Sequence, residues 1–196
     1  MFKRIFDFLA AFFGIMFLLP FLLIVGVLVA VTSKGGVFYI QQRIGKSEVP
    51  FGLYKFRSMA TGSDKKGLLT VGAKDSRVTK IGYYLRKYKL DELPQLINVL
   101  IGDMSLVGPR PEVKKYTDLY NAEQKKVLQV RPGITDYASL AYFDENTLLG
   151  KSDNPEKTYI EEIMPAKLKL NAKYLDEVGV AADIKIILQT LKKIIS

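Results

Sequence analysis

The chain contains no cysteine and no histidine, and these two absences exclude several classes of chemistry. Without cysteine there is no disulfide, no thiolate nucleophile and no soft-metal site. Without histidine there is no serine–histidine triad, no imidazole base and none of the usual zinc sites. Any catalysis must therefore use Asp, Glu, Lys, Arg, Tyr or Ser. Any metal must be a hard ion held by oxygen, with Mg²⁺ as the leading candidate.

Negative charge is also scarce, because 20 acidic residues face 29 Lys and Arg and leave a formal net charge of +9. An excess of positive charge favours anionic partners, which are phosphates, acidic lipid headgroups or nucleic acid. Charge alone does not choose among them. The cations match no nucleic-acid-binding motif, so we expect no nucleic acid among the partners.

One long segment near the N-terminus carries no charge at all. Residues 8–33 are almost entirely apolar, and as one helix they would reach roughly 39 Å, enough for a hydrocarbon core of about 30 Å. This length predicts a membrane protein. Lys3 and Arg4 precede the segment and Lys34 follows it. Basic flanks favour the cytoplasmic side, and a straight span cannot place both flanks there.

Pro20 stands at the middle of this segment. Proline removes one helical hydrogen bond and bends the helix. Each half is then about 18 to 20 Å long, too short to cross, so a hairpin that enters one leaflet and returns would satisfy both flanks. An ordinary kinked single-pass helix is the alternative, because proline is common in transmembrane helices.

The remaining 160 or so residues are enough for one domain with its own core. Short strands are predicted between Gly35 and Met59, and helices over residues 78–90, 91–100, 113–129, 155–175 and 183–195. A type II turn is expected at residues 131–133. The helices over 78–90 and 183–195 are basic and amphipathic, so each either lies on a bilayer or closes the core. The predicted fold class is α+β, mainly helical.

Two adjacent carboxylates, Asp91 and Glu92, begin the predicted helix over 91–100. One interpretation is simple capping, since acidic residues suit the first turn of a helix. In the other, the helix N-terminus and Arg86 lower the pKa of Asp91 and keep it ionised. An ionised carboxylate can attack phosphorus and form an acyl phosphate. Glu92 would then hold Mg²⁺ against the same phosphate.

Several cations are candidates for an anion site. Arg110 lies between Pro109 and Pro111, which restrict the backbone, and its planar guanidinium suits phosphate oxygens. A rigid surface turn is the alternative for this segment. Lys55 and Arg57 are two residues apart on a predicted strand, so they project from one face, where they are either solvated or line an anion site.

Four segments together resemble the successive motifs of the bacterial sugar transferases, the small monotopic phosphoglycosyl transferases. They are residues 55–59, 90–100, 102–111 and 130–135. The resemblance implies a re-entrant membrane helix over residues 1–34, broken at Pro20, and a catalytic domain over residues 35–196. It places the protein at the bacterial inner membrane, with the globular part facing the cytoplasm.

The resemblance also implies an activity. Members of this family move a sugar 1-phosphate from a UDP-sugar to a polyprenyl phosphate and release UMP, with Mg²⁺, through a covalent phosphosugar. In this chain the nucleophile would be Asp91, and the metal would be bound by Glu92 with Asp91. The phosphate and substrate ligands would be Arg86, Arg110, Lys55, Arg57 and Arg131. Membrane lipid is a further implied partner, and a homodimer is one of the oligomeric states left open.

Two departures from the family pattern bear on these expectations. Leu19 precedes the membrane proline where many members have a small polar residue. Residues 136–146 differ from the segment common in relatives, so the sugar is not named by the sequence; an N-acetylated amino sugar or a deoxy amino sugar is expected. The competing hypothesis is a non-catalytic, membrane-anchored anion-binding protein, whose binding would depend on many dispersed cations and little on Asp91 or Glu92.

Overall fold

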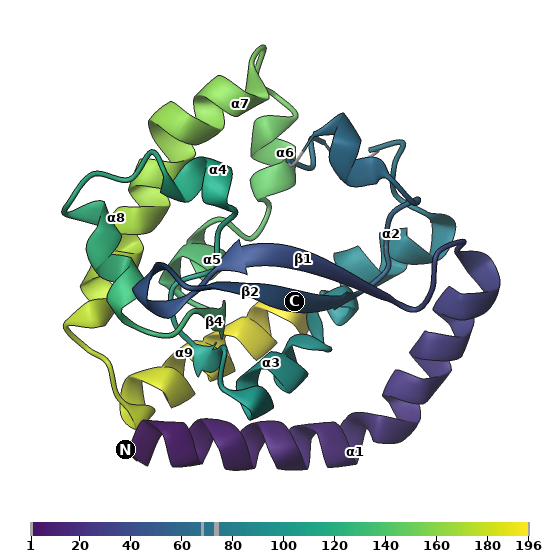
Figure 1. Cartoon of the computed structure of the whole chain (residues 1–196), viewed down its shortest axis with the longest axis horizontal. Helices are drawn as coiled ribbons and strands as arrows, with labels where there is room; N and C mark the ends of the chain where they lie inside the picture. Colours follow the sequence, from purple (N-terminus) through teal and green to yellow (C-terminus); the bar gives the residue numbers. More distant parts are fainter. Residues whose placement is uncertain (1, 68, 73–74, 196) are drawn as a thin grey trace.

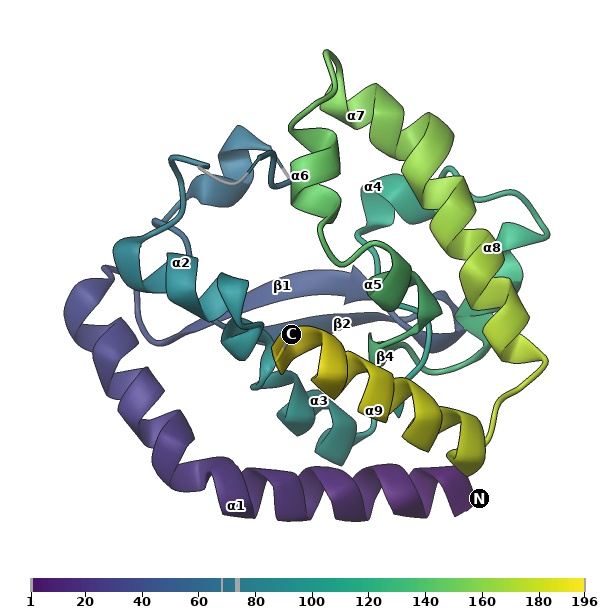
Figure 2. The ribbon, with the colours of Figure 1, turned by 180° about the vertical axis from the view of Figure 1, so that it is seen from behind.

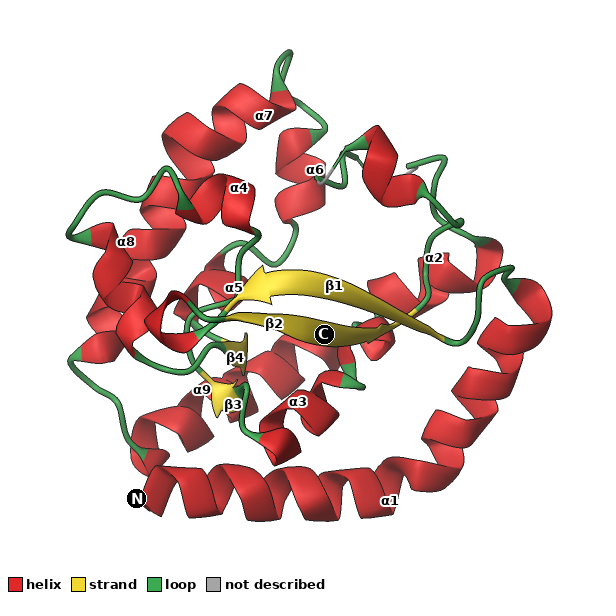
Figure 3. Cartoon of the chain, viewed as in Figure 1, coloured by secondary structure: helices red, strands yellow, loops and turns green. Residues whose placement is uncertain are grey.

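The computed structural model describes residues 2–67, 69–72 and 75–195. Helices make up most of it (Figure 3), which confirms the predicted α+β, mainly helical class. The helices are α1 (Phe2–Thr32), α2 (Lys80–Lys87), α3 (Gln95–Ile101), α4 (Lys114–Thr117), α5 (Tyr137–Ala141), α6 (Glu145–Leu149), α7 (Pro155–Thr158), α8 (Met164–Leu175) and α9 (Val180–Ile195). The strands are β1 (Phe38–Ile44), β2 (Pro50–Phe56), β3 (Ser105–Val107) and β4 (Gly133–Thr135).

Helix α1 is continuous and contains Pro20. It changes direction about midway and follows two sides of the rest of the molecule (Figure 1). Among the described residues it is the one helix long and apolar enough to cross a membrane. Most of its large apolar side chains near the bend are uncovered, and Phe17 is 85% exposed. The rest of the fold therefore does not bury this surface.

Polar contacts join the first turns of α1 to the domain. Asp7 is 2% exposed, and its carboxylate accepts hydrogen bonds from Ser105 Oγ at 2.8 Å and from the Leu106 amide at 3.1 Å. Arg4 donates to the Leu100 carbonyl at 2.9 Å, at the end of α3. A buried carboxylate is stable only when hydrogen-bonded in this way. The start of the apolar helix is thus an integral part of the fold.

The second half of α1 also contacts the domain, through apolar side chains. Val25 and Val29 are buried with Phe56 of β2 and Leu85 of α2. Both halves of the bent helix are consequently packed on the same body, while the bend between them is not.

Strands β1 and β2 form an antiparallel hairpin near the centre of the molecule, with Phe38 opposite Phe56. The side chain of Asn98 fixes α3 against this hairpin. Its Oδ1 accepts from the Tyr54 amide at 3.0 Å and its Nδ2 donates to the Gly52 carbonyl at 2.7 Å. Asn98 is fully buried, and its amide satisfies two backbone groups that would otherwise lack partners.

The prediction of a type II turn at residues 131–133 is wrong. Such a turn needs a positive φ at its third residue, and Gly133 is not among the residues with positive φ. Gly133 instead begins β4, which pairs in parallel with β3. Glycine is required there because a Cβ on Gly133 would lie 2.1 Å from the amide nitrogen of Gly108.

Two predicted helices are also corrected. The helix expected over 113–129 is split into α4 and a 3₁₀ segment at Gln124–Gln129. Asn121 and Gln124 exchange side-chain hydrogen bonds with each other's amides and start this new turn. The helix expected from Asp91 begins at Gln95, with Pro94 as its N-cap, and Asp91 lies in a preceding 3₁₀ turn, Leu90–Glu92. The predictions over 78–90, 155–175 and 183–195 correspond to α2, to α7 with α8, and to α9.

Helix α9 crosses the back of the molecule, and it begins beside the start of α1 (Figure 2). Asp183 is fully buried and accepts hydrogen bonds from Lys3 and, at 2.6 Å, from the Tyr174 hydroxyl. Ile186, also fully buried, packs with Val107 and Tyr174. These contacts join the N-terminal helix to the C-terminal helix.

We expect Gly133→Ala to lower the free energy of unfolding by at least about 2 kcal/mol, because the added methyl group would overlap the Gly108 backbone. Thermal unfolding of the purified protein in detergent measures the effect. Gly179→Ala is the matched control, since the nearest atom to its added Cβ lies at 3.8 Å. Equal unfolding midpoints for the two variants would contradict this account.

Candidate active site

A large cleft brings together most of the residues singled out in the sequence. It has a volume of about 700 Å³, within the range of small-molecule sites. Lys55 enters it from β2, Arg86 from α2, and Arg110 from the loop after β3. Asp91 and Glu92 enter it from the 3₁₀ turn before α3.

Glu92 is the centre of a partly buried ion-pair cluster, and its own side chain is 13% exposed. Arg110 donates through both terminal nitrogens, Nη1 to Oε2 at 3.1 Å and Nη2 to Oε1. Lys55 Nζ donates to Oε1 at 3.0 Å. Burial opposes ionisation of Glu92, but Arg110 and Lys55 outweigh it and hold the pKa of this carboxyl well below its usual value. Glu92 is therefore ionised at neutral pH.

Asp91 has a different environment from its neighbour. Asp91 is buried, with 4% of its surface exposed. Ser58 Oγ donates to its Oδ2 at 3.4 Å. Burial raises the pKa of Asp91, and the adjacent Glu92 raises it further. Arg86 does lower this pKa, as expected, but burial and Glu92 outweigh it, so the expected net lowering is wrong. The helix N-terminus does not contribute as expected, because Asp91 does not begin α3. A desolvated carboxylate has less hydration to shed when it attacks an electrophile.

Two further cations face these carboxylates. Arg86 lines the cleft and donates to Thr70 Oγ1 at 2.7 Å. Lys89 also lines the cleft, and burial lowers its pKa. Lys89 was not selected as a site residue from the sequence; its place directly before the 90–100 segment was the available signal. Lys89 has a left-handed backbone, with φ of 55°, and this conformation separates α2 from the 3₁₀ turn that carries Asp91.

Two of the predicted phosphate ligands, Arg57 and Arg131, donate hydrogen bonds to backbone carbonyls and not to the site carboxylates. Arg57 lines the cleft, but its guanidinium donates to the carbonyls of Gly36 and Phe38, each at 3.0 Å. Arg131 is exposed and donates to the Gly102 carbonyl at 2.8 Å. Arg131 is not among the described residues that line the cleft. The structure therefore brings Lys55, Arg86 and Arg110 to the carboxylates, and it does not bring Arg131 there.

Asp136 positions the Pro-Arg-Pro segment and was not selected from the sequence. This fully buried residue accepts from the Arg110 amide at 2.9 Å and from the Ser139 amide at 2.5 Å, so it also caps α5. Its position as the N-cap of a short helix was the only local feature of the sequence that could have indicated its structural role. The link to Arg110, 26 residues away, depends on the tertiary fold.

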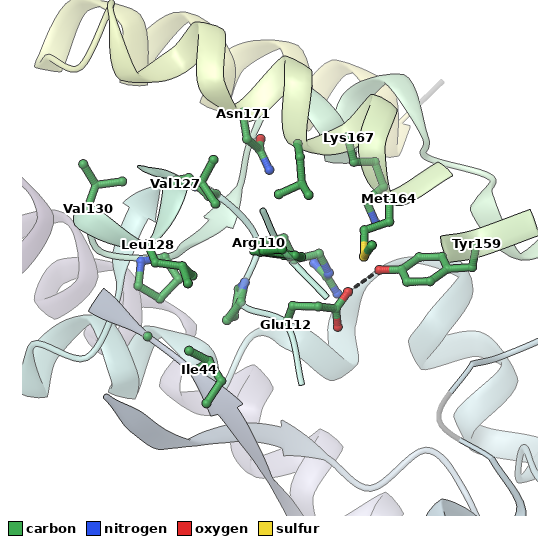
Figure 4. Close-up of a pocket in the computed structure, with 16 residues that line it drawn as sticks. Ile44, Arg110, Glu112, Val127, Leu128, Val130, Tyr159, Met164, Lys167 and Asn171 are labelled. Carbon is green, nitrogen blue, oxygen red and sulfur yellow. Dashed lines mark hydrogen bonds between the residues drawn. The ribbon is translucent and has the colours of Figure 1, made fainter. Parts of the chain in front are cut away.

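Glu112 anchors the other end of the same segment. Its Oε1 accepts from Arg43 at 2.7 Å, and its Oε2 accepts from the Tyr159 hydroxyl. Burial would raise the pKa of Glu112, but Arg43 and Lys167 outweigh it and lower the pKa. Glu112, Tyr159 and Lys167 line a small cavity of about 30 Å³ (Figure 4), which accommodates water and is too small for a nucleotide.

The two site carboxylates suit a magnesium ion. Mg²⁺ prefers oxygen ligands and is usually held by one or two carboxylates, with substrate phosphates and water completing its shell. Asp91 and Glu92 provide such a pair. No group of three or more acidic, His or Cys side chains that could hold a metal occurs among the described residues. A bound Mg²⁺ would accordingly take its other ligands from substrate and water.

Comparison with known proteins agrees with this geometry. The profile of the bacterial sugar transferase family matches residues 1–196. A UDP-N-acetylgalactosamine-undecaprenyl-phosphate N-acetylgalactosaminephosphotransferase of Aeromonas hydrophila is 35% identical over 197 residues, which cover 99% of this chain and 44% of that protein. A UDP-glucose:undecaprenyl-phosphate glucose-1-phosphate transferase of Klebsiella pneumoniae is 34% identical, over 98% of this chain and 40% of that protein.

A third relative has a length similar to that of this chain. The exopolysaccharide production protein PSS of Rhizobium leguminosarum bv. phaseoli is 35% identical over 197 residues, which cover 96% of this chain and 92% of that protein. The chain thus spans less than half of the first two relatives and nearly all of the third.

We expect Arg110→Met to destabilise the protein by about 2 kcal/mol, because it leaves Glu92 buried with only one of the two cations that contact it. Arg131→Met is the matched control, since its guanidinium is exposed, and its effect should stay within about 0.5 kcal/mol. Denaturant unfolding in detergent measures both. Combining Arg110→Met with Glu92→Gln should recover part of the loss. A double variant as unstable as the sum of the single variants would contradict the coupling.

Proposed function

Because this chain belongs to the bacterial sugar transferase family, we propose that it transfers a sugar 1-phosphate from a UDP-sugar to a polyprenyl phosphate. The products are UMP and a polyprenyl diphosphate sugar, and the reaction is a first membrane step of glycoconjugate biosynthesis. The observation that carries the proposal is the pair of buried Asp91 and partly buried Glu92, which lies in one cleft with Lys55, Arg86 and Arg110. A nucleophile and cations for phosphate groups are thereby in one place.

In the first step, an Asp91 carboxylate oxygen attacks the phosphorus that bears the sugar. A bond forms between this oxygen and phosphorus, and the bond from phosphorus to the bridging oxygen of the diphosphate breaks. UMP leaves with the electron pair, and the sugar phosphate stays on Asp91 as an acyl phosphate. Arg110 and Lys55 are positioned to offset negative charge on the phosphates, which is the main role of cations in phosphoryl transfer.

In the second step, a phosphate oxygen of the polyprenyl phosphate attacks the same phosphorus. The aspartyl oxygen–phosphorus bond breaks, the diphosphate forms, and the Asp91 carboxylate is regenerated. Asp91 and Glu92 would hold the Mg²⁺, which when bound supplies positive charge to the phosphates. Glu92 stays ionised throughout, because Arg110 and Lys55 keep its pKa low.

The packing of α1 supports a re-entrant topology. Asp7 in the first half and Val25 with Val29 in the second half all contact the same domain. A helix that enters and leaves on one side of the bilayer can keep both sets of contacts, whereas a straight span carries one half away from the domain. We place the globular part on the cytoplasmic face, in agreement with the basic residues on both flanks.

The two relatives described above are named for the transfer of N-acetylgalactosamine phosphate and glucose 1-phosphate. For this chain we favour an N-acetylated amino sugar or deoxy amino sugar. Residues 136–146 contribute Ser139, Leu140, Tyr142, Phe143 and Glu145 to the cleft, which supports a role for this divergent segment in donor recognition.

We expect Asp91→Asn to lower UMP release by at least about 1,000-fold, because an amide cannot form the acyl phosphate. The assay incubates purified protein with a panel of UDP-sugars, undecaprenyl phosphate and Mg²⁺. The wild-type protein should also retain label from a sugar-labelled donor, and chelation of Mg²⁺ should abolish both signals. Ser58→Ala is the control for folding around Asp91. Undiminished turnover in Asp91→Asn would remove Asp91 as the nucleophile.

The topology is testable with single cysteines, since the chain has none of its own. Phe2→Cys and Asp153→Cys place thiols at exposed positions in the first turn of α1 and in the domain. A membrane-impermeant maleimide should label neither in intact cells and both after permeabilisation. Labelling of one position alone in intact cells would favour a single-pass span.

A further inference from the structure

The cleft that holds Asp91 continues along an apolar face of α9. The side chains on this face recur at helical spacing and line the cleft: Ile184, Ile187, Leu188, Leu191 and Ile194. Several of them are uncovered by protein, with Leu188 61% exposed and Leu191 51% exposed. Apolar side chains from the rest of the fold line the same cleft: Phe6 and Ala10 of α1, Leu96 of α3, Leu106 of β3 and Ile134 of β4.

The orientation of α9 is fixed by its opposite side. Asp183 and Ile186 are fully buried, and Asp183 is hydrogen-bonded to Lys3 and to Tyr174. These contacts prevent the helix from rotating to bury Leu188 and Leu191 against the domain. The apolar face of α9 is therefore held open toward the cleft, and the buried contact with Lys3 keeps it beside α1.

The two parts of the cleft differ in chemistry. Around Asp91 and Glu92 lie Lys55, Arg86 and Arg110, which suit a phosphate. Along α9 the wall is hydrocarbon, and leaving such a wall in contact with water is unfavourable. A UDP-sugar is polar along its whole length and gains nothing from this wall. A ligand with a phosphate at one end and a hydrocarbon chain at the other matches both parts.

We infer that the groove between α9 and the first half of α1 holds the first isoprene units of the polyprenyl phosphate acceptor. The acceptor phosphate lies toward Asp91, and the chain passes along Leu188 and Leu191. Phe6 and Ala10 belong to the membrane helix, so the groove is continuous with the surface from which a lipid would enter. This inference rests on the proposed function, because it concerns the acceptor of that reaction.

The first test separates the acceptor step from the donor step. In the double variant Leu188→Ser/Leu191→Ser, the KM for undecaprenyl phosphate should rise about tenfold or more, since two buried leucine contacts are lost. The KM for the UDP-sugar, and the single burst of UMP released without acceptor, should be unchanged. The rise should be smaller for an acceptor with one isoprene unit than for undecaprenyl phosphate, because the shorter chain makes fewer contacts with the groove.

Ile195→Ser is the matched control. Ile195 is on the same helix and is 85% exposed, but it is not among the described residues that line the cleft. Its KM for undecaprenyl phosphate should stay within about twofold of the wild-type value. An equal rise for Ile195→Ser would mean that α9 acts as a membrane-docking surface, and would overturn the groove. An unchanged KM in the double variant would overturn it as well.

The second test does not depend on catalysis. Leu188→Cys, combined with Asp91→Asn, provides a thiol in the groove of an inactive protein. Undecaprenyl phosphate should slow its reaction with a maleimide at least threefold, and phosphatidylglycerol vesicles should not. Ile195→Cys in the same background should be unaffected. Equal protection by phosphatidylglycerol would assign the groove to bulk lipid, whereas protection by undecaprenyl phosphate alone would stand even if Asp91 proved not to be the nucleophile.

Discussion

The site depends on holding two adjacent carboxylates largely out of water, with Asp91 buried and Glu92 partly buried. Glu92 is tolerated there because Arg110 binds both of its oxygens and Lys55 binds one. The fold fixes both cations. Lys55 is held by its position in β2, next to Tyr54, whose amide donates to Asn98. Arg110 is held by the hydrogen bond from its own amide to Asp136. Removing either cation would leave Glu92 less compensated in a partly desolvated site.

The same physical rule explains how an apolar helix is attached to this domain. Lys3, Arg4 and Asp7 are all used in hydrogen bonds with groups of the domain or of α9. The charged first turns of α1 are structural, and the apolar turns that follow supply the uncovered surface. Because the cleft includes Phe6 and Ala10, the attachment also sets the position of α1 relative to Asp91 and Glu92.

The sequence predicted which residues meet in the cleft better than it predicted their surroundings there. The order of the motifs was enough to select Asp91, Glu92, Lys55 and Arg110, and the periodicity was enough for α2, α8 and α9. The pKa direction of Asp91 was predicted wrongly because burial and the start of α3 depend on packing. Asp136 was missed for a related reason, since its contact spans 26 residues. At Gly133 the residue type was informative, but the cause is close backbone approach and not a turn.

Under the proposed mechanism, in which UMP leaves before the acceptor reacts, the charge of the site favours sequential use of one cleft by two substrates. Lys55, Arg86, Lys89 and Arg110 act on Asp91 and Glu92, which leaves two positive charges before any metal is counted. A UDP-sugar diphosphate brings about two negative charges and balances them, and an acceptor phosphate bound at the same time would add nearly two more. Departure of UMP after the first step removes that conflict. The acceptor phosphate can then approach a phosphosugar on Asp91 in a site whose cations are again free to receive it.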